Sequence, residues 1–164
     1  GALRWEDAER LPWSVLILFG GGLSLAHALS STGVAAWLGS AMTALEALPM
    51  IVIVVAVTAV VLFLTELTSN TATAAVFLPI AGSVAVGMGH DPFVFVIPAA
   101  LAASCAFMMP VATPPNAIVF ASGRLTIPQM ASAGLWINLV MLVLINVFVL
   151  LLAARVFGAA AIPM

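Results

Sequence analysis

Long apolar stretches alternate with short polar interruptions along this chain, and their lengths predict membrane-spanning helices. Residues 11–33 form a first apolar block about as long as the hydrocarbon core of a bilayer, and residues 126–157 form a last one. Between them, residues 34–48 mix small and apolar side chains with Trp37, which favours a helix lying along the membrane interface. We therefore expect a span, an interfacial arm helix and a final span at these positions.

The block at residues 49–89 is too long for one crossing of a membrane. A continuous helix from Met50 to Met88 would measure roughly 58 Å, nearly twice the hydrocarbon thickness of about 30 Å. Its centre holds a polar island, residues 65–73, which has no Gly, Pro, Lys or Arg and so differs from an ordinary solvated loop. We interpret the block as a re-entrant helical hairpin with the island at its tip. Two full spans joined at the surface are the alternative.

The block at residues 92–122 contains two adjacent prolines, Pro114 and Pro115, in its second half. Because proline has no N–H, the carbonyls of Pro110 and Val111 lose their helical partners, and Thr113 is pushed toward an extended conformation. Loose carbonyls at membrane depth are natural ligands for a small cation. We expect a Pro-broken transmembrane helix that unwinds at residues 113–116, with a purely mechanical kink as the alternative.

Composition restricts the class of protein further. With 65% hydrophobic and 6% charged residues, the chain cannot hide its apolar surface in a water-soluble globule of 164 residues. The net charge is −2 and the basic residues are scattered, which excludes nucleic-acid binding. Neither a Ser–His pairing nor a cluster of metal ligands is apparent, so we do not expect an enzyme. The sequence predicts an all-α integral membrane protein.

The polar island and the broken helix together predict a binding site near the middle of the membrane. Helix N-termini at the two interruptions would favour an anion, and free carbonyls would favour a cation. Ser69, Asn70 and Thr71 can cap the second limb of the hairpin, and their side chains can equally bind a substrate carboxylate. Neither interruption contains Lys or Arg, so co-bound cations would have to balance a dianion there. This is the layout of a secondary transporter.

Several polar and small residues outside this motif leave alternatives open. Glu66 could lie at the outer rim, pair with a distant Arg, or take part in cation or proton coupling, and a structural or rim position is favoured. Asn138 and Asn146 are expected to bond to neighbouring helices. The three glycines at residues 20–22 favour close helix packing.

Two stretches carry a specific family resemblance. The first is Thr65–Glu66–Leu67–Thr68–Ser69–Asn70–Thr71–Ala72–Thr73, and the second runs from Ser104 to Phe120 with Met-Met-Pro-Val-Ala-Thr-Pro-Pro-Asn at its centre. In this order and spacing they closely resemble the divalent anion:sodium symporter family, which carries dicarboxylates, citrate or sulfate. The resemblance covers essentially the whole chain and corresponds to the C-terminal repeat of that family.

The resemblance implies an architecture larger than this chain. Proteins of the family are homodimers, and each subunit consists of two inverted repeats with a Ser-Asn-Thr hairpin and a broken helix in each. They work by an elevator-type movement, and residues 34–48 would match the arm that links scaffold and moving domain. Only one Ser-Asn-Thr motif occurs here. We therefore expect a polytopic transporter half whose N-terminal partner half belongs to the same protein.

The resemblance also implies roles for individual residues. Asn70 and Thr71, with Ser69 beside them, would contact the substrate together with Thr113 and Pro114. A sodium site would be formed by Thr65, Thr68, Asn70 and Ala112, partly through backbone carbonyls. Sodium is the expected coupling ion, and no organic cofactor is expected.

These implications combine into one expected function. The chain would belong to a secondary active transporter that couples sodium to the import of small divalent anions, such as C4-dicarboxylates, citrate or sulfate. Its place would be the lipid bilayer of the cell membrane, which in a bacterium is the inner membrane. The alternatives are a sodium-independent dicarboxylate exchanger of the same family and a structural or channel-forming membrane subunit that does not transport.

Overall fold

The computed structural model describes residues 5, 9, 13–34, 37 and 48–153. Within these residues every regular element is a helix, which confirms the expected all-α fold. The helices in order are α2 (Trp13–Ser31), α4 (Met50–Leu64), α5 (Asn70–Gly87), α6 (Phe93–Ala102), α7 (Pro114–Ala121) and α8 (Ile127–Phe148), and α8 continues into a π-helical turn, η2 (Val149–Ala153). The interfacial arm expected at residues 34–48 lies almost wholly outside the described residues.

Local capping chemistry sets where three of these helices begin. Ser69 precedes α5 and its Oγ accepts a hydrogen bond of 3.1 Å from the N–H of Ala72. Thr126 precedes α8 and forms a capping box with Gln129. Thr113 precedes α7, whose first two residues are prolines. Prolines have no N–H group, but the N–H groups of a first helical turn have no partner within the helix anyway, so proline suits these positions.

The helix break at residues 92–122 is longer and lies earlier than the sequence predicts. α6 ends at Ala102 and α7 begins at Pro114, so residues 103–113, called the break below, separate the two helices. Thr113 is extended, with φ −143° and ψ 154°, as expected. The expected interruption at residues 113–116 is wrong in position, because Pro114 and Pro115 start a helix here and do not interrupt one.

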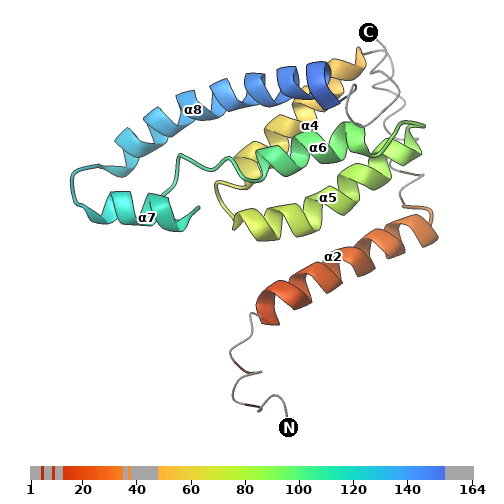
Figure 1. Cartoon of the computed structure of the whole chain (residues 1–164), viewed down its shortest axis with the longest axis horizontal. Coiled ribbons are helices and arrows are strands. Elements are labelled where there is room, and N and C mark those ends of the chain that lie inside the picture. The colour runs from red at the N-terminus through yellow and green to blue at the C-terminus, as the bar shows by residue number, and fades with distance from the viewer. Residues whose placement is uncertain (1–4, 6–8, 10–12, 35–36, 38–47, 154–164) are drawn as a thin grey trace.

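The helices α4, α5, α6 and α8 pack into one body, and α2 lies along α5 (Figure 1). The core between them is formed by side chains such as Leu62, Phe95 and Ala99, all fully buried. At the α2–α5 contact, a Cβ added to Gly22 would lie 2.3 Å from the carbonyl oxygen of Ala75. Close packing therefore requires Gly22, whereas a Cβ at Gly20 or Gly21 would meet nothing within 4 Å.

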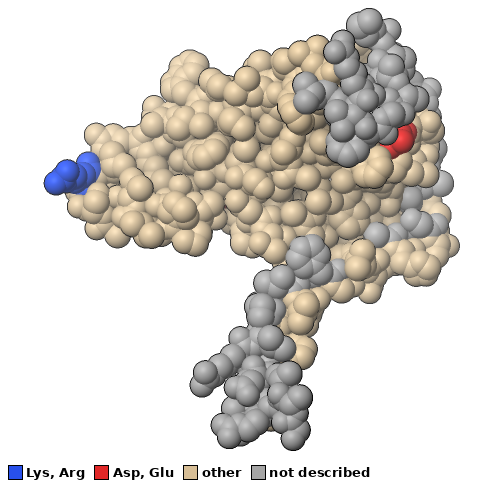
Figure 2. All heavy atoms as spheres, viewed as in Figure 1, with Lys and Arg blue, Asp and Glu red and all other residues tan. Residues whose placement is uncertain are grey.

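The surface of this body has the polarity expected for a membrane protein. Among the described residues, α5 and the stretch Ile127–Leu151 are long and apolar enough to cross a membrane. Figure 2 shows a basic patch at the end where α7 meets α8, and an acidic one at the opposite end, where α5 meets α6. Arg124 and Asp91 are the exposed charged residues of these two connections. The face between these ends is uncharged in this view.

Candidate functional site

The connection between α4 and α5, residues 65–69, meets the break at a buried cluster of oxygen atoms. Thr65 is fully buried, and its Oγ lies 2.8 Å from the carbonyl oxygen of Ala103 and 2.7 Å from Oδ1 of Asn70. A hydroxyl group has one proton to donate, so Thr65 serves one of these acceptors at a time. Three neutral oxygens therefore converge where the α4–α5 connection touches the first residue of the break.

Glu66, the next residue, binds the middle of the break. Its Oε1 accepts hydrogen bonds from the N–H groups of Phe107 at 2.7 Å and Met108 at 3.0 Å. Its Oε2 accepts from Met108 at 2.9 Å and from Met109 at 3.1 Å. The residue is only 3% exposed. The carboxylate thus replaces the helical carbonyls that these three N–H groups lack.

The helix α8 supports this contact from the other side. Asn138, which is fully buried, donates a hydrogen bond of 2.6 Å from Nδ2 to Oε1 of Glu66. One turn earlier, a Cβ added to Gly134 would lie 2.4 Å from the carbonyl oxygen of Phe107 and 2.6 Å from Cα of Met108. The backbone of the break therefore packs directly on α8 where α8 has no side chain.

Asn116, in the first turn of α7, binds the carbonyl side of the break. Its Nδ2 donates to the carbonyl oxygen of Ala106 at 2.9 Å and to that of Met109 at 3.1 Å. Glu66 takes the N–H groups of the same segment. Two side chains from different elements thus satisfy backbone groups that helix unwinding would otherwise leave unpaired.

The carboxylate of Glu66 is surrounded by N–H donors. Four donor groups, three from the backbone and one from Asn138, point at its two oxygens. Among the described residues the only Arg or Lys is Arg124, which is exposed in the α7–α8 connection. All described partners of its two oxygens are donors. Glu66 is thus a buried carboxylate held by amide groups. Of the structural or rim position favoured from the sequence, the structural one is confirmed and the rim one is wrong.

The residues expected to bind substrate lie at two helix N-termini. Ser69, Asn70 and Thr71 are at the start of α5, where Asn70 is half-buried and the other two are exposed. Thr113 and Pro114 are at the start of α7, and Oγ of Thr113 accepts a hydrogen bond of 3.4 Å from the N–H of Asn116. Among the described hydrogen bonds, none joins these two groups directly. Both groups adjoin the break: Asn70 contacts Thr65, which binds the first residue of the break, and Thr113 is its last residue.

The residues expected to bind sodium are brought together in part. Thr65 and Asn70 are in direct contact, as described above. The hydroxyl of Thr68 bonds to the carbonyl oxygen of Leu64 at 3.1 Å and also meets the hydroxyl of Thr73. Ala112 is buried near the end of the break, where its N–H donates to the carbonyl oxygen of Met109. The contact of Thr65 with Ala103 was not predicted from the sequence, because every residue has a backbone carbonyl and nothing local distinguishes this one.

The two asparagines of α8 differ from each other. Asn138 bonds to the α4–α5 connection and not to a neighbouring helix, whereas Nδ2 of Asn146 donates to the carbonyl oxygen of Leu142 in its own helix. The expectation of a bond to a neighbouring helix is therefore wrong for both, although Asn138 does bond to another element of the fold. An asparagine side chain inside a helix can bond back to the carbonyl oxygen four residues earlier, and Asn146 does so here.

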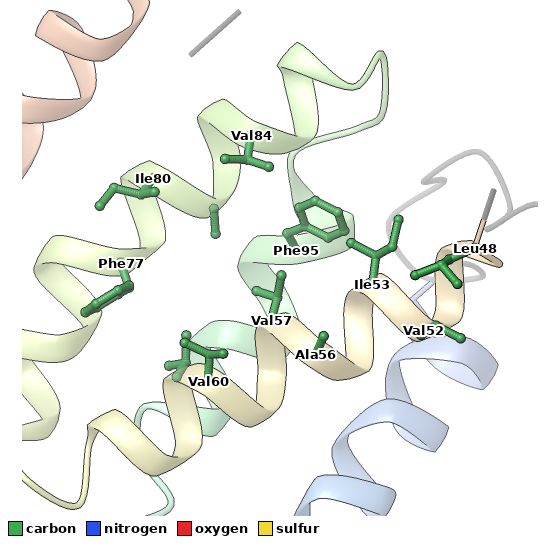
Figure 3. A pocket seen from close by; sticks show the side chains of 12 residues that line it. Leu48, Val52, Ile53, Ala56, Val57, Val60, Phe77, Ile80, Val84 and Phe95 are labelled. Carbon is green, nitrogen blue, oxygen red and sulfur yellow. The ribbon is translucent and has the colours of Figure 1, made fainter. Parts of the chain in front are cut away.

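A pocket of about 340 Å³ lies between α4, α5 and α6, away from these polar groups (Figure 3). Its lining consists of apolar side chains such as Val57, Phe77 and Phe95. Such a surface offers no hydrogen-bond donors to a charged solute. The pocket is therefore not the anion site, and the candidate site remains at the α4–α5 connection and the break.

Comparisons with known proteins agree on one family. The sequence matches the family model of the sodium:sulfate symporter transmembrane region over residues 2–159. The sodium-dependent dicarboxylate transporter SdcS of Staphylococcus aureus strain MRSA252 is 51% identical over 154 residues, which are 94% of this chain and 30% of that protein. The SdcS proteins of strains USA300 and NCTC 8325 have the same identity and coverage. This chain thus spans 30% of the length of the curated relatives it matches.

Proposed function

The chain belongs to the sodium:sulfate symporter family, and from this premise we propose that it is the C-terminal part of a sodium-coupled importer of small divalent anions. The relatives of known name are sodium-dependent dicarboxylate transporters, which supports a C4-dicarboxylate as substrate. The protein acts in the cell membrane. Its N-terminal half completes the site, and two copies form a homodimer.

The position of the α4–α5 connection supports a re-entrant hairpin. Glu66 in this connection bonds to Asn138, which lies near the middle of α8. Since α8 and its continuation are long enough to cross a membrane, a contact at its middle corresponds to the middle of the bilayer. Both limbs then enter and leave on one side, and the tip carries its polar groups at membrane depth.

Two helix N-termini supply the attraction for an anion. α5 begins after Ser69 and α7 begins after Thr113, and each N-terminus carries a partial positive charge. At α5 the N–H groups of Asn70 and Thr71 precede the helix's own hydrogen bonds, whereas α7 starts with two prolines and contributes its dipole alone. The hydroxyl and amide groups of Asn70, Thr71 and Thr113 add donors at the same ends. A carboxylate of the substrate binds between these ends, and the second carboxylate is bound by the N-terminal half.

The oxygen cluster at Thr65 fits sodium. Oγ of Thr65 lies 2.7 Å from Oδ1 of Asn70 and 2.8 Å from the carbonyl oxygen of Ala103. Neutral side-chain and unwound-backbone oxygens are the ligands that sodium takes in transporters with broken helices. Thr68 and Ala112 complete the ligand set through their carbonyl oxygens. The bound ion offsets the negative charge of the substrate, and this couples sodium binding to substrate binding.

The contacts also favour an elevator-type movement. The hairpin, the break and α8 are joined by buried hydrogen bonds, whereas α2 contacts α5 with Gly22 against the backbone of Ala75. A junction held by several buried hydrogen bonds costs more to open than a van der Waals contact between two helices. In this mechanism the hairpin, the break and α8 move together as one rigid body relative to α2.

The hydrogen-bonded junction between the α4–α5 connection and the break is the observation that carries this proposal. Its test is uptake of labelled succinate by the full-length protein in proteoliposomes, with a sodium gradient or with choline in place of sodium. Asn70→Ala and Thr71→Ala should each abolish most uptake, while Ser132→Ala, on an exposed position of α8, should leave it unchanged. Equal uptake with choline would favour the sodium-independent exchanger, and parental uptake by both variants would overturn the substrate site.

A further inference from the structure

We infer that Glu66 is the positioning residue that couples sodium binding to anion binding, by joining the oxygen cluster at Thr65 to the N-terminus of α7 through the break. This inference rests on the proposed function and adds the series of contacts by which sodium binding affects anion binding. It assigns a role to a buried carboxylate that touches neither the ion cluster nor the anion side chains in the described hydrogen bonds.

The first step of the path is that two adjacent side chains bind different parts of the break. Thr65 contacts the carbonyl oxygen of Ala103, at the start of the break, and Glu66 contacts the N–H groups of Phe107 to Met109, in its middle. The α4–α5 connection therefore holds the break at two points. A cation that draws Thr65 and Ala103 together also fixes the position of the Glu66 carboxylate relative to the break.

The second step leads from Glu66 to the anion side. Met109 is bound on both sides, since its N–H donates to Glu66 and its carbonyl oxygen accepts from Asn116. Asn116 lies in the first turn of α7, and its own N–H donates to Oγ of Thr113. A continuous series of hydrogen bonds thus links Glu66 to the cap of the helix whose N-terminus faces the anion. Such contiguous contacts are a physical route for coupling between two sites.

The geometry requires a carboxylate of this length. Both oxygens accept, Oε1 from three donors and Oε2 from two, with Met108 shared between them. A glutamine in place of Glu66 would direct an NH₂ group at backbone N–H groups, and an aspartate would fall one methylene short. The carboxylate is buried, and its oxygens already accept hydrogen bonds from amide groups. In the inferred role it therefore affects anion binding indirectly, through the break, and does not touch the substrate.

The experiment uses the full-length protein in proteoliposomes and compares Glu66→Gln with Asp91→Asn. Asp91 is the matched control, because its carboxylate also accepts a backbone hydrogen bond, 2.8 Å from the N–H of Phe93, but is exposed. The readout is the coupling ratio, defined as the KM for succinate at limiting sodium divided by the KM at saturating sodium. E66Q should lower this ratio by at least about fivefold, the low end of ordinary coupling, while D91N should keep the parental ratio.

A structural role alone would reduce the amount of active protein or kcat and leave the coupling ratio unchanged, and that result overturns the inference. If E66Q does not reconstitute, Asn138→Ala replaces it, since it removes only one of the four donors. N138A should lower the ratio by a smaller factor, and a parental ratio in N138A then overturns the inference. A parental protein whose KM does not depend on sodium would instead overturn the proposed function itself.

Discussion

Asn138 and Glu66, 72 residues apart in the chain, are joined by a hydrogen bond of 2.6 Å from Nδ2 of Asn138 to Oε1 of Glu66. Both residues are almost completely buried. The bond ties the α4–α5 connection to the middle of α8, and the break is bound to the same carboxylate. A buried charge that is held only by amides makes this junction sensitive to the loss of any donor.

Removing the Asn138 donor should destabilise the protein more than removing the other buried amide of α8. Asn138→Ala loses a hydrogen bond to a charged group, with an expected cost of about 1.5–3 kcal/mol. Asn146→Ala loses a bond to its own helix, with an expected cost below about 1 kcal/mol. Thermal unfolding of the purified full-length variants in detergent should show the larger decrease for N138A, and equal midpoints would contradict the importance of the junction.

A methyl group at Gly134 should disrupt the packing of the break on α8. The Cβ of Gly134→Ala would overlap the backbone of Phe107 and Met108, which cannot rotate away. We expect a loss of at least about 1–3 kcal/mol and weaker transport. Gly82→Ala in α5 is the control, because its Cβ would meet the movable Val96 side chain at 3.3 Å. The measurement is the unfolding midpoint with the initial uptake rate, and a G134A protein that matches G82A would be the opposing result.

The hydroxyl of Thr65 should matter for sodium. Thr65→Val keeps the shape and removes the oxygen that lies beside Ala103 and Asn70, so the KM for sodium should rise by about tenfold, as expected for one lost polar contact. Thr58→Val is the matched control, since Thr58 is equally buried but bonds to the carbonyl oxygen of Val54 in its own helix. Uptake measured over a series of sodium concentrations distinguishes them. An unchanged sodium KM in T65V would remove Thr65 from the cation site.

The amide of Asn116 should be needed for anion affinity. Asn116→Asp places a carboxylate against the carbonyl oxygens of Ala106 and Met109, so the break and the start of α7 should separate. We expect the KM for succinate to rise by more than about tenfold, since two bonds to Nδ2 are lost.

The control for Asn116→Asp is Gln129→Glu. Gln129 is also the third residue of a helix, and there a glutamate keeps the capping interaction with Thr126. Succinate KM at saturating sodium is measured for both variants. If the two variants have the same KM as the parent, Asn116 has no part in holding the anion end.

Local sequence chemistry predicts a large part of this molecule. Apolar block lengths predict the helices of a membrane protein, and the polar island at residues 65–73 contains the connection between α4 and α5. The capping side chains of Ser69 and Thr113 and the extended conformation of Thr113 also follow from residue type. These features depend on groups close together in the chain, which is why the sequence contains them. The extent of the break was not predictable, since prolines indicate where α7 can start and not where α6 must end.

The sequence by itself determined the all-helical membrane architecture and the two polar interruptions, because length, hydropathy and proline chemistry act locally, and its two motifs carried the family resemblance. Only the tertiary structure decided how the interruptions are joined. The partners of Glu66 are backbone N–H groups 41 to 43 residues away and an amide 72 residues away. Backbone groups are the same in every residue, so no pattern in the sequence marks which of them will face a buried carboxylate. Folding brings them together because a charge and unpaired N–H groups cannot remain separate in an apolar interior.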